Sequence, residues 1–266
     1  MSDPTVIPLL TPLIAVGEPP AVTVVNAEGP SDFVLVCDHA SNAIPLALGQ
    51  LGLSENELAG HIAWDIGAAG VARQLSERLG AVLVLQNYSR LVIDCNRPLQ
   101  ASDSITTSSE WTSISANENL PEAAIASRIS AVFQPYHEQL QQILDERRRE
   151  GRSSLLIAVH SFTPTYRGTP RPWEISIMYN RDARLAKALL QQLARDKRLV
   201  VGDNEPYSVS DDSDYTLPVH GEARRIPHVG IEIRQDLIAN ELSQTTWAGR
   251  LSSLLQQAAK DMAVAG

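Results

Sequence analysis

Polar and charged side chains follow four short apolar runs of the sequence. The four stretches read CDHASN from Cys37, SRLVIDCNRP from Ser89, LLIAVHSFTP from Leu155 and HVGIEIRQD from His228. One strand end of this kind is typical of a turn or of a satisfied polar group in the core. Four are harder to explain as packing, because parallel strands bring their carboxyl ends to one edge of a sheet, where ligands bind. The pattern indicates a site assembled from several strand ends.

Two of these strand ends carry a histidine, His39 and His160. A catalytic zinc ion commonly takes two histidines and a carboxylate and leaves one position open for water. Asp65, directly before an apolar helical pattern, is a candidate for the third ligand, and an N-cap is the competing interpretation. Asp38 could orient His39 or cap the turn that follows the strand.

Glu232 lies between Ile231 and Ile233 in an apolar run, so it should be buried and should need a partner. Arg234, two residues on and on the same face of a strand, could form a structural pair with it. The alternative is a general base that takes a proton from a metal-activated water.

Arg90, Asn96 and Arg97 cluster around Asp94. Guanidinium groups match carboxylates bidentately, so the cluster predicts an anion clamp, with a buried ion pair, for example Asp94–Arg97, as the alternative. The formal net charge of −9 argues against nucleic acid or an anionic membrane as a partner. An acidic small molecule can still bind where a few arginines converge.

Nucleophilic catalysis is the less favoured chemistry. Cys37 stands next to Asp38 and His39, yet it continues the buried run and should belong to the core. Ser161 lacks the glycines of a nucleophile elbow, and no phosphate-binding glycine motif occurs in the sequence.

The elements that must position these groups alternate along the chain. Strands are predicted at Val22–Asn26, Phe33–Cys37, Ala81–Leu85, Arg90–Asp94, Ser154–Val159, Glu174–Tyr179 and Val229–Ile233. Helices are predicted at Asp65–Leu79, Pro121–Arg149, Asp182–Leu193 and Thr245–Met262. This order predicts an α/β fold with a mostly parallel mixed sheet and helices on both faces. The long irregular stretches Leu99–Leu120 and Gly202–Pro227 should cover a site or be mobile.

The length of 266 residues allows one large domain or two small ones, and we expect a single domain over residues 1–266 with an N-terminal arm over residues 1–20. The arm lacks the basic residues of a signal peptide, and prolines break its apolar run. With two cysteines, Cys37 and Cys95, we expect reduced thiols and a cytoplasmic protein without a membrane span.

Five stretches, in this order, together resemble the N-formylglutamate amidohydrolase family, and the resemblance covers most of the chain, from about Phe33 to Asp236. They read CDHASNAIP, HIAWDIGA, SRLVIDCNRP, AVHSFTP and YTLPVHGEARRIPHVGIEIRQDL. The first motif has an Asp-His-Ala-Ser form where many members carry Pro-His-Ser-Gly. The resemblance therefore identifies the family better than it identifies the substrate.

The order of these motifs is also similar to that of zinc carboxypeptidases and aspartoacylase. There a metal-binding Glu lies three residues after the first His, a position that Asn42 occupies here. Because an amide is a poor zinc ligand, the resemblance points to Asp65 as its replacement. It also implies that Arg90 polarises the scissile carbonyl group.

The resemblance implies an enzyme with one zinc ion per chain, bound by His39, Asp65 and His160, which converts N-formyl-L-glutamate and water to formate and L-glutamate. Glu232 is then the base and Arg90 stabilises the oxyanion. The residues expected to bind the substrate are Asn96, Arg97, Arg234 and His220, the last of which could instead be an exposed loop histidine. Another zinc hydrolase acting on an N-acyl amino acid or peptide, and a non-catalytic metal- or amino-acid-binding protein, remain alternatives. The oligomeric state is left open.

Overall fold

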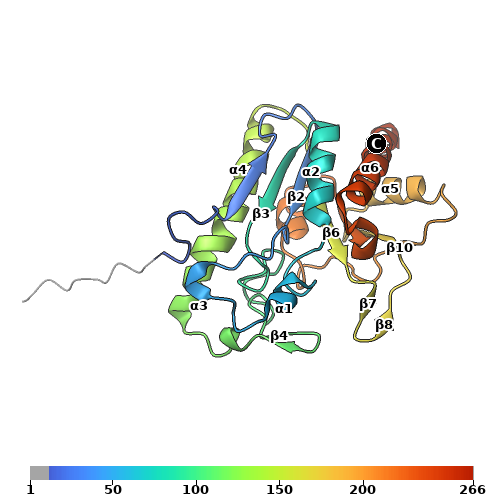
Figure 1. Cartoon of the computed structure of the whole chain (residues 1–266). Coiled ribbons are helices and arrows are strands. Elements are labelled where there is room, and N and C mark those ends of the chain that lie inside the picture. The colour runs from blue at the N-terminus through green and yellow to red at the C-terminus, as the bar shows by residue number, and fades with distance from the viewer. Residues whose placement is uncertain (1–11, 266) are drawn as a thin grey trace, which may run out of the picture.

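Short runs of Val, Leu and Ile form a seven-stranded mixed sheet in the computed structural model, which describes residues 12–265 (Figure 1). In sheet order the strands are β1 (Val22–Val25), β3 (Val82–Gln86), β2 (Phe33–Cys37), β6 (Leu155–Phe162), β11 (His228–Arg234), β9 (Ile175–Met178) and β10 (Val201–Asp203). The four strands from β3 to β11 are parallel, whereas β1 and β9 run antiparallel to their inner neighbours and β10 runs parallel to β9. The inner strands are buried on both faces, which is why they read as continuous apolar runs.

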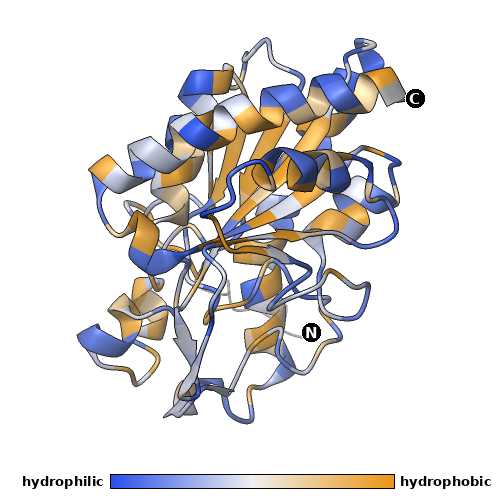
Figure 2. Cartoon of the chain, turned by 90° about the vertical axis from the view of Figure 1, so that its right-hand side faces the viewer, coloured by the Kyte–Doolittle hydropathy of each residue, from blue (hydrophilic) through white to orange (hydrophobic). Residues whose placement is uncertain are grey.

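Helices cover both faces of the sheet. One apolar cluster joins the sheet to α2 (Ala68–Leu79), α5 (Arg184–Leu193) and α6 (Glu241–Ala265), and another joins it to η3 (Ile129–Phe133) and α4 (Gln134–Arg149). The remaining helical segments are α1 (Glu55–Ala59), α3 (Glu122–Arg128), η1 (Leu46–Leu48), η2 (Ser115–Asn117), η4 (Leu217–Glu222) and η5 (Gln235–Ile238). In Figure 2 the strands are mostly apolar and the helices beside them combine apolar and polar residues. The predicted α/β fold with a mostly parallel mixed sheet is confirmed.

One predicted strand is wrong. Residues 90–94 form turns instead of a strand, because the Ser89 side chain accepts a hydrogen bond from the Leu91 amide and donates one to the Ala63 carbonyl group. The apolar side chains of this segment are still buried. The hydrophobicity of the sequence therefore could not show that the segment lacks the backbone hydrogen bonds of a sheet. The predicted helix over residues 121–149 contains a wide π turn, η3, and the short strand β10 was not predicted.

Both long irregular stretches carry structure beyond the carboxyl ends of the parallel strands. The hairpin β4–β5 (Ser108–Ser109, Thr112–Ser113) belongs to the first stretch, and η4 belongs to the second. Asn117 anchors the first stretch, since its amide donates to the carbonyl groups of Leu91 and Thr106 while its oxygen accepts from buried Arg128. A further hairpin, β7–β8 (Thr165–Tyr166, Thr169–Pro170), extends from β6 at the same end of the sheet (Figure 1).

The described part of the expected N-terminal arm, residues 12–20, lies against the chain just after β3. Tyr88 donates from its hydroxyl to the Pro19 carbonyl at 2.7 Å, and Asn87 donates to the Pro20 carbonyl at 2.8 Å. Residues 1–11 of that arm lie outside the described residues. Across residues 12–265, every helix is too short or too polar to cross a membrane.

Candidate metal centre and active site

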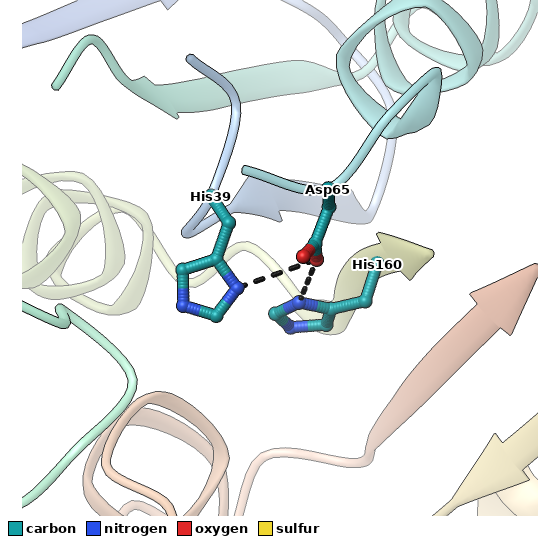
Figure 3. A group of neighbouring side chains, drawn as sticks. All are labelled: His39, Asp65 and His160. Carbon is teal, nitrogen blue, oxygen red and sulfur yellow. Dashed lines mark hydrogen bonds and ion pairs between the residues drawn. The ribbon is translucent and has the colours of Figure 1, made fainter. Parts of the chain in front are cut away.

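The side chains of His39, Asp65 and His160 meet at the carboxyl end of the sheet (Figure 3). Asp65 Oδ2 lies 2.9 Å from His160 Nδ1 and 3.3 Å from His39 Nδ1. One ligand atom from each residue lies within 4.8 Å of the others, and all three residues are buried. Two imidazole nitrogens and a carboxylate oxygen at this spacing fit a divalent transition-metal ion.

The fold presents Asp65 to the two histidines through its backbone. The Asp65 amide donates to the His39 carbonyl at 3.0 Å, which ties the loop after β2 to the segment before α2. Gly67 then turns the chain into the helix with φ +81°, and a Cβ at this position would lie 2.3 Å from the Ile238 carbonyl oxygen. The N-cap of α2 is Gly67, so the interpretation of Asp65 as the N-cap is wrong.

Asn42 is not directed to this group, because its amide donates to the Leu58 carbonyl at 2.9 Å. Of the two residues considered for the third ligand, Asp65 alone therefore lies with the histidines.

The Nε2 atom of each histidine contacts a carboxylate other than that of Asp65. His39 Nε2 lies 2.7 Å from Asp94 Oδ1, and His160 Nε2 lies 3.2 Å from Asp38 Oδ2. Such outer carboxylates orient metal-binding imidazoles and raise their basicity, leaving both Nδ1 atoms for the metal. Asp38 orients His160 rather than His39, which corrects the interpretation that it could orient His39.

Asp38 is itself fixed by two hydroxyl groups. Tyr136 and Thr216 donate to Asp38 Oδ1 at 2.8 and 2.6 Å. Burial opposes the charge of Asp38, yet His160, His39 and the Thr216 hydroxyl lower its pKa to about 2. Neither hydroxyl was predicted, because Tyr136 lies on α4 and Thr216 directly before η4, far from Asp38 in sequence.

The charges of the centre are strongly coupled. Burial disfavours the imidazolium form of His160, yet its hydrogen bonds to the carboxylates of Asp38 and Asp65 raise its pKa well above the ordinary value. Burial likewise opposes the charge of Asp65, and the two histidines hold its pKa far below the usual range. The carboxylates thus favour positive charge at this point, which a bound cation would supply once the imidazoles lose their protons.

Glu232 lies beside the centre, since the parallel register of β11 and β6 pairs it with His160. It is 8% exposed, and its Oε2 atom is buried without a hydrogen-bond partner among the described residues. Burial raises the pKa of Glu232 to about 7, because desolvation and the negative charge of Asp65 outweigh the nearby cations. Arg234 pairs with Asp236 instead of Glu232, so the structural pair considered from the sequence does not form within residues 12–265.

A cavity of about 520 Å³ opens over these groups. Its lining includes the three candidate ligands and Glu232, together with Arg90, Asn96 and Arg97. Arg90 pairs with Asp94 Oδ2 at 2.6 Å and lies 3.7 Å from Asp65 Oδ1. The buried ion pair considered as the alternative does form at Asp94, but its partner is Arg90 and not Arg97, the example chosen from the sequence.

Asn96 and Arg97 are largely engaged with the protein itself. Asn96 accepts from the amides of Tyr215 and Thr216 and donates to Asp214, while Arg97 pairs with Asp103 at 3.0 Å. Their contacts hold the segment that precedes η4 against the cavity.

Two further residues predicted to bind substrate do not line the cavity. Arg234 pairs with Asp236 at 2.8 Å and donates to backbone carbonyl groups of residues 171–173. His220 is 2% exposed and lies 3.1 Å from His137 Nδ1 through its Nε2 atom, so the alternative of an exposed loop histidine is wrong.

The alternative nucleophiles are poorly placed. Cys37 is fully buried in the apolar cluster that faces α2, and desolvation raises the pKa of its thiol well above the ordinary value. Ser161 lines the cavity but donates its hydroxyl to the Ile66 carbonyl at 2.8 Å. Cys37 and Cys95 are both buried free thiols, as expected.

Comparisons with known proteins agree with this geometry. The family model described as N-formylglutamate amidohydrolase matches residues 31–239. A gene product of Agrobacterium tumefaciens of known crystal structure is 43% identical with a TM-score of 0.91, over 94% of this chain and 99% of that chain. The structure of an N-formylglutamate amidohydrolase from Ralstonia eutropha is 21% identical with a TM-score of 0.68, over 92% of this chain and 99% of that chain.

An aspartoacylase family protein from Mesorhizobium loti is 13% identical with a TM-score of 0.36, over 87% of this chain and 60% of that chain. No curated protein sequence matches the chain. The family match spans more than half of the sequence and includes every residue of the candidate centre. The chain therefore belongs to the N-formylglutamate amidohydrolase family and is a hydrolase that acts on an amide bond.

Proposed function

We propose that the protein hydrolyses the N-formyl amide of an acidic amino acid, with N-formyl-L-glutamate and water giving formate and L-glutamate. The observation that carries this proposal is the buried, unpartnered Glu232 carboxylate next to the His39–Asp65–His160 group in a cavity. A carboxylate kept free of partners at such a place is suited to accept a proton from water. The printed name of the Ralstonia eutropha relative supports the choice of N-formylglutamate as the substrate.

We propose zinc as the resident ion, bound through His39 Nδ1, His160 Nδ1 and Asp65 Oδ2. The donor set fits zinc, which when bound acts as a Lewis acid and lowers the pKa of water. Asp94 and Asp38 would keep the two imidazoles in the tautomer that leaves each Nδ1 unprotonated.

Glu232 would carry the proton through the reaction. Its carboxylate takes a proton from the attacking water as the water oxygen bonds to the formyl carbon, and it later delivers that proton to the departing amine nitrogen when the C–N bond breaks. A pKa raised to about 7 by burial suits both steps near neutral pH. Arg90, charged and directed to the centre by Asp94, would stabilise the negative charge that develops on the carbonyl oxygen.

Asn96 and Arg97 remain candidates for binding a substrate carboxylate at the cavity wall, whereas Arg234 and His220 would act only by supporting segments that line it. The remaining proposals are that residues 1–266 form one domain, that the enzyme works in the cytoplasm and that its partner is the small substrate alone.

The proposal is tested by formate release from N-formylglutamate, N-acetylaspartate and short peptides, with zinc-loaded wild-type protein and Glu232→Gln. We expect the formyl compound to be the best substrate and the variant to lose about 10³- to 10⁴-fold in kcat while keeping its zinc. Wild-type protein that binds zinc but releases no formate would overturn the proposed substrate. A variant that keeps full activity would remove Glu232 from the role of base.

A further inference from the structure

Arg171 lines the same cavity and was not predicted from the sequence. Its side chain pairs with no carboxylate of residues 12–265, and its Nη1 atom is buried without a hydrogen-bond partner among those residues. The residue is 9% exposed. A buried guanidinium without an anion is costly, so an acceptor that is not part of residues 12–265 should satisfy it.

Aromatic rings hold this guanidinium in place. Its Cζ atom lies 4.7 Å from the Tyr166 ring centroid, 4.8 Å from that of Tyr207 and 5.9 Å from that of Phe162. Cation–π contacts use the faces of a guanidinium and leave its N–H edges free. An N–H edge fixed in this way is prepared to bind a carboxylate bidentately at little cost in side-chain entropy.

The backbone around Arg171 is also anchored. Its amide donates to the Pro164 carbonyl at 2.8 Å, which closes the base of the β7–β8 hairpin, and Arg234 donates to the carbonyl groups of the residues that follow. Arg234 thus supports the wall that carries Arg171.

The other arginines close to the metal centre already have anionic partners. Arg90 pairs with Asp94, and Arg97 pairs with Asp103. Arg171 is the cavity arginine whose charge no carboxylate of residues 12–265 neutralises and whose side chain is mostly buried.

We propose that Arg171 binds a carboxylate group of the N-acyl amino acid substrate and so makes the enzyme select anionic substrates. This inference rests on the proposed function, because it assumes that the cavity takes an N-acyl amino acid. It assigns one carboxylate of the substrate to an arginine that directly follows a hairpin outside the sequence motif, in addition to the Asn96–Arg97 pair of the motif.

The test compares three substrates with wild-type protein and Arg171→Gln: N-formylglutamate, N-formylglutamine and N-formylisoglutamine, the last two with one carboxylate changed to an amide. We expect Arg171→Gln to lose at least about 100-fold in kcat/KM on N-formylglutamate. For one of the two amides, the variant and wild-type protein should agree within about threefold, because the partner of Arg171 is absent from that substrate. That amide identifies the carboxylate bound. Equal losses on all three substrates, or no loss, would overturn the assignment.

Arg167→Gln is the matched control, since Arg167 belongs to the same hairpin but is exposed. If only positive charge at the cavity mouth mattered, both variants would show the same selectivity change, and the proposal would fail. Arg171→Lys keeps the charge but loses the bidentate geometry and should fall between the wild type and Arg171→Gln. Zinc content and the circular dichroism spectrum identify a variant that fails to fold.

Binding measured by calorimetry separates this inference from the proposed reaction. N-formylglutamate is titrated into zinc-loaded Glu232→Gln and into Glu232→Gln/Arg171→Gln. Binding weakened at least about 30-fold by the second substitution supports Arg171 even if the wild type releases no formate. Equal affinities, or no binding to either protein, would overturn the role of Arg171 whatever the turnover.

Discussion

The floor and the wall of the cavity are built on different principles. The floor consists of His39, Asp65 and His160, which stand at strand ends or directly before a helix and are held by carboxylates and backbone groups. The wall consists of hairpins and loops, and its arginine, Arg171, is held by contacts with aromatic rings. Directional bonds fix atoms to the geometry that a metal and a proton transfer need, whereas ring faces tolerate sliding.

The buried polar atoms without a hydrogen-bond partner within residues 12–265 include Glu232 Oε2, beside the floor, and Arg171 Nη1, in the wall. The two groups have opposite charge, which suits different parts of one substrate: a base for the water that attacks the amide and a cation for a carboxylate. The following predictions separate the two regions, from the largest effect to the smallest.

Loss of a floor ligand should abolish activity. His160→Ala removes one of three ligands, so zinc content and formate release should both fall to background. Elemental analysis of the purified protein measures the zinc. Asn42→Ala is the control, because its amide only donates to the Leu58 carbonyl, and it should keep its zinc. Equal zinc in wild type and His160→Ala would discard the ligand set.

Loss of a carboxylate behind a metal-binding histidine should weaken zinc binding without abolishing it. Asp94→Asn removes the charge behind His39 and one partner of Arg90, so zinc affinity should fall about 10- to 100-fold. Competition with a chelator measures the affinity. Asp103→Asn removes the partner of Arg97 in the wall, and its zinc affinity should stay that of the wild type. An equal loss in both variants would remove the distinction between floor and wall.

The pH dependence of kcat/KM should report Glu232. Because a base must be ionised and burial raises the pKa of Glu232 to about 7, activity should fall as pH decreases below neutrality. A bound cation lowers that pKa, so the midpoint should lie at or below about 7. A profile that stays flat from about pH 5 to about pH 8 would contradict this role of the carboxylate.

Loosening the rim of the wall should change substrate binding only modestly. Glu110 accepts from the Arg167 amide at 3.1 Å and pairs with His61 at 3.2 Å, which links the two hairpins at the cavity mouth. Glu110→Gln should raise KM about two- to fivefold and leave kcat and zinc content unchanged, because exposed pairs contribute little free energy. Steady-state kinetics measure both constants. A large fall in kcat would place the rim in the chemistry.

The floor could be predicted from the sequence to a large extent. Val34–Cys37 and Leu155–Val159 are apolar enough to identify buried strands, and the histidines after them are local to those strands. Asp65 was ambiguous, because an acid before a helix is equally typical of a cap. The Asp65–His39 backbone bond and the glycine N-cap removed that ambiguity.

The wall could hardly be predicted. Arg171 lies in the stretch TPRPWE, which has no apolar periodicity and no motif, and its ring partner Tyr207 comes from a loop 36 positions away in the sequence. Arg234 and His220, by contrast, were predicted to bind substrate but do not line the cavity. Both stand in motif stretches, but Arg234 is turned to the backbone of residues 171–173 and His220 to His137.

The sequence by itself determined the strand and helix pattern, the acidic balance and the residues that end the buried strands, because hydrophobic periodicity and turn chemistry act over a few neighbouring residues. Only the tertiary structure decided which side chains meet. The register of β11 on β6 places Glu232 beside His160, and the hairpin beyond β6 brings Arg171 to the cavity. Such contacts join residues distant in the chain, and the packing of the whole sheet determines them.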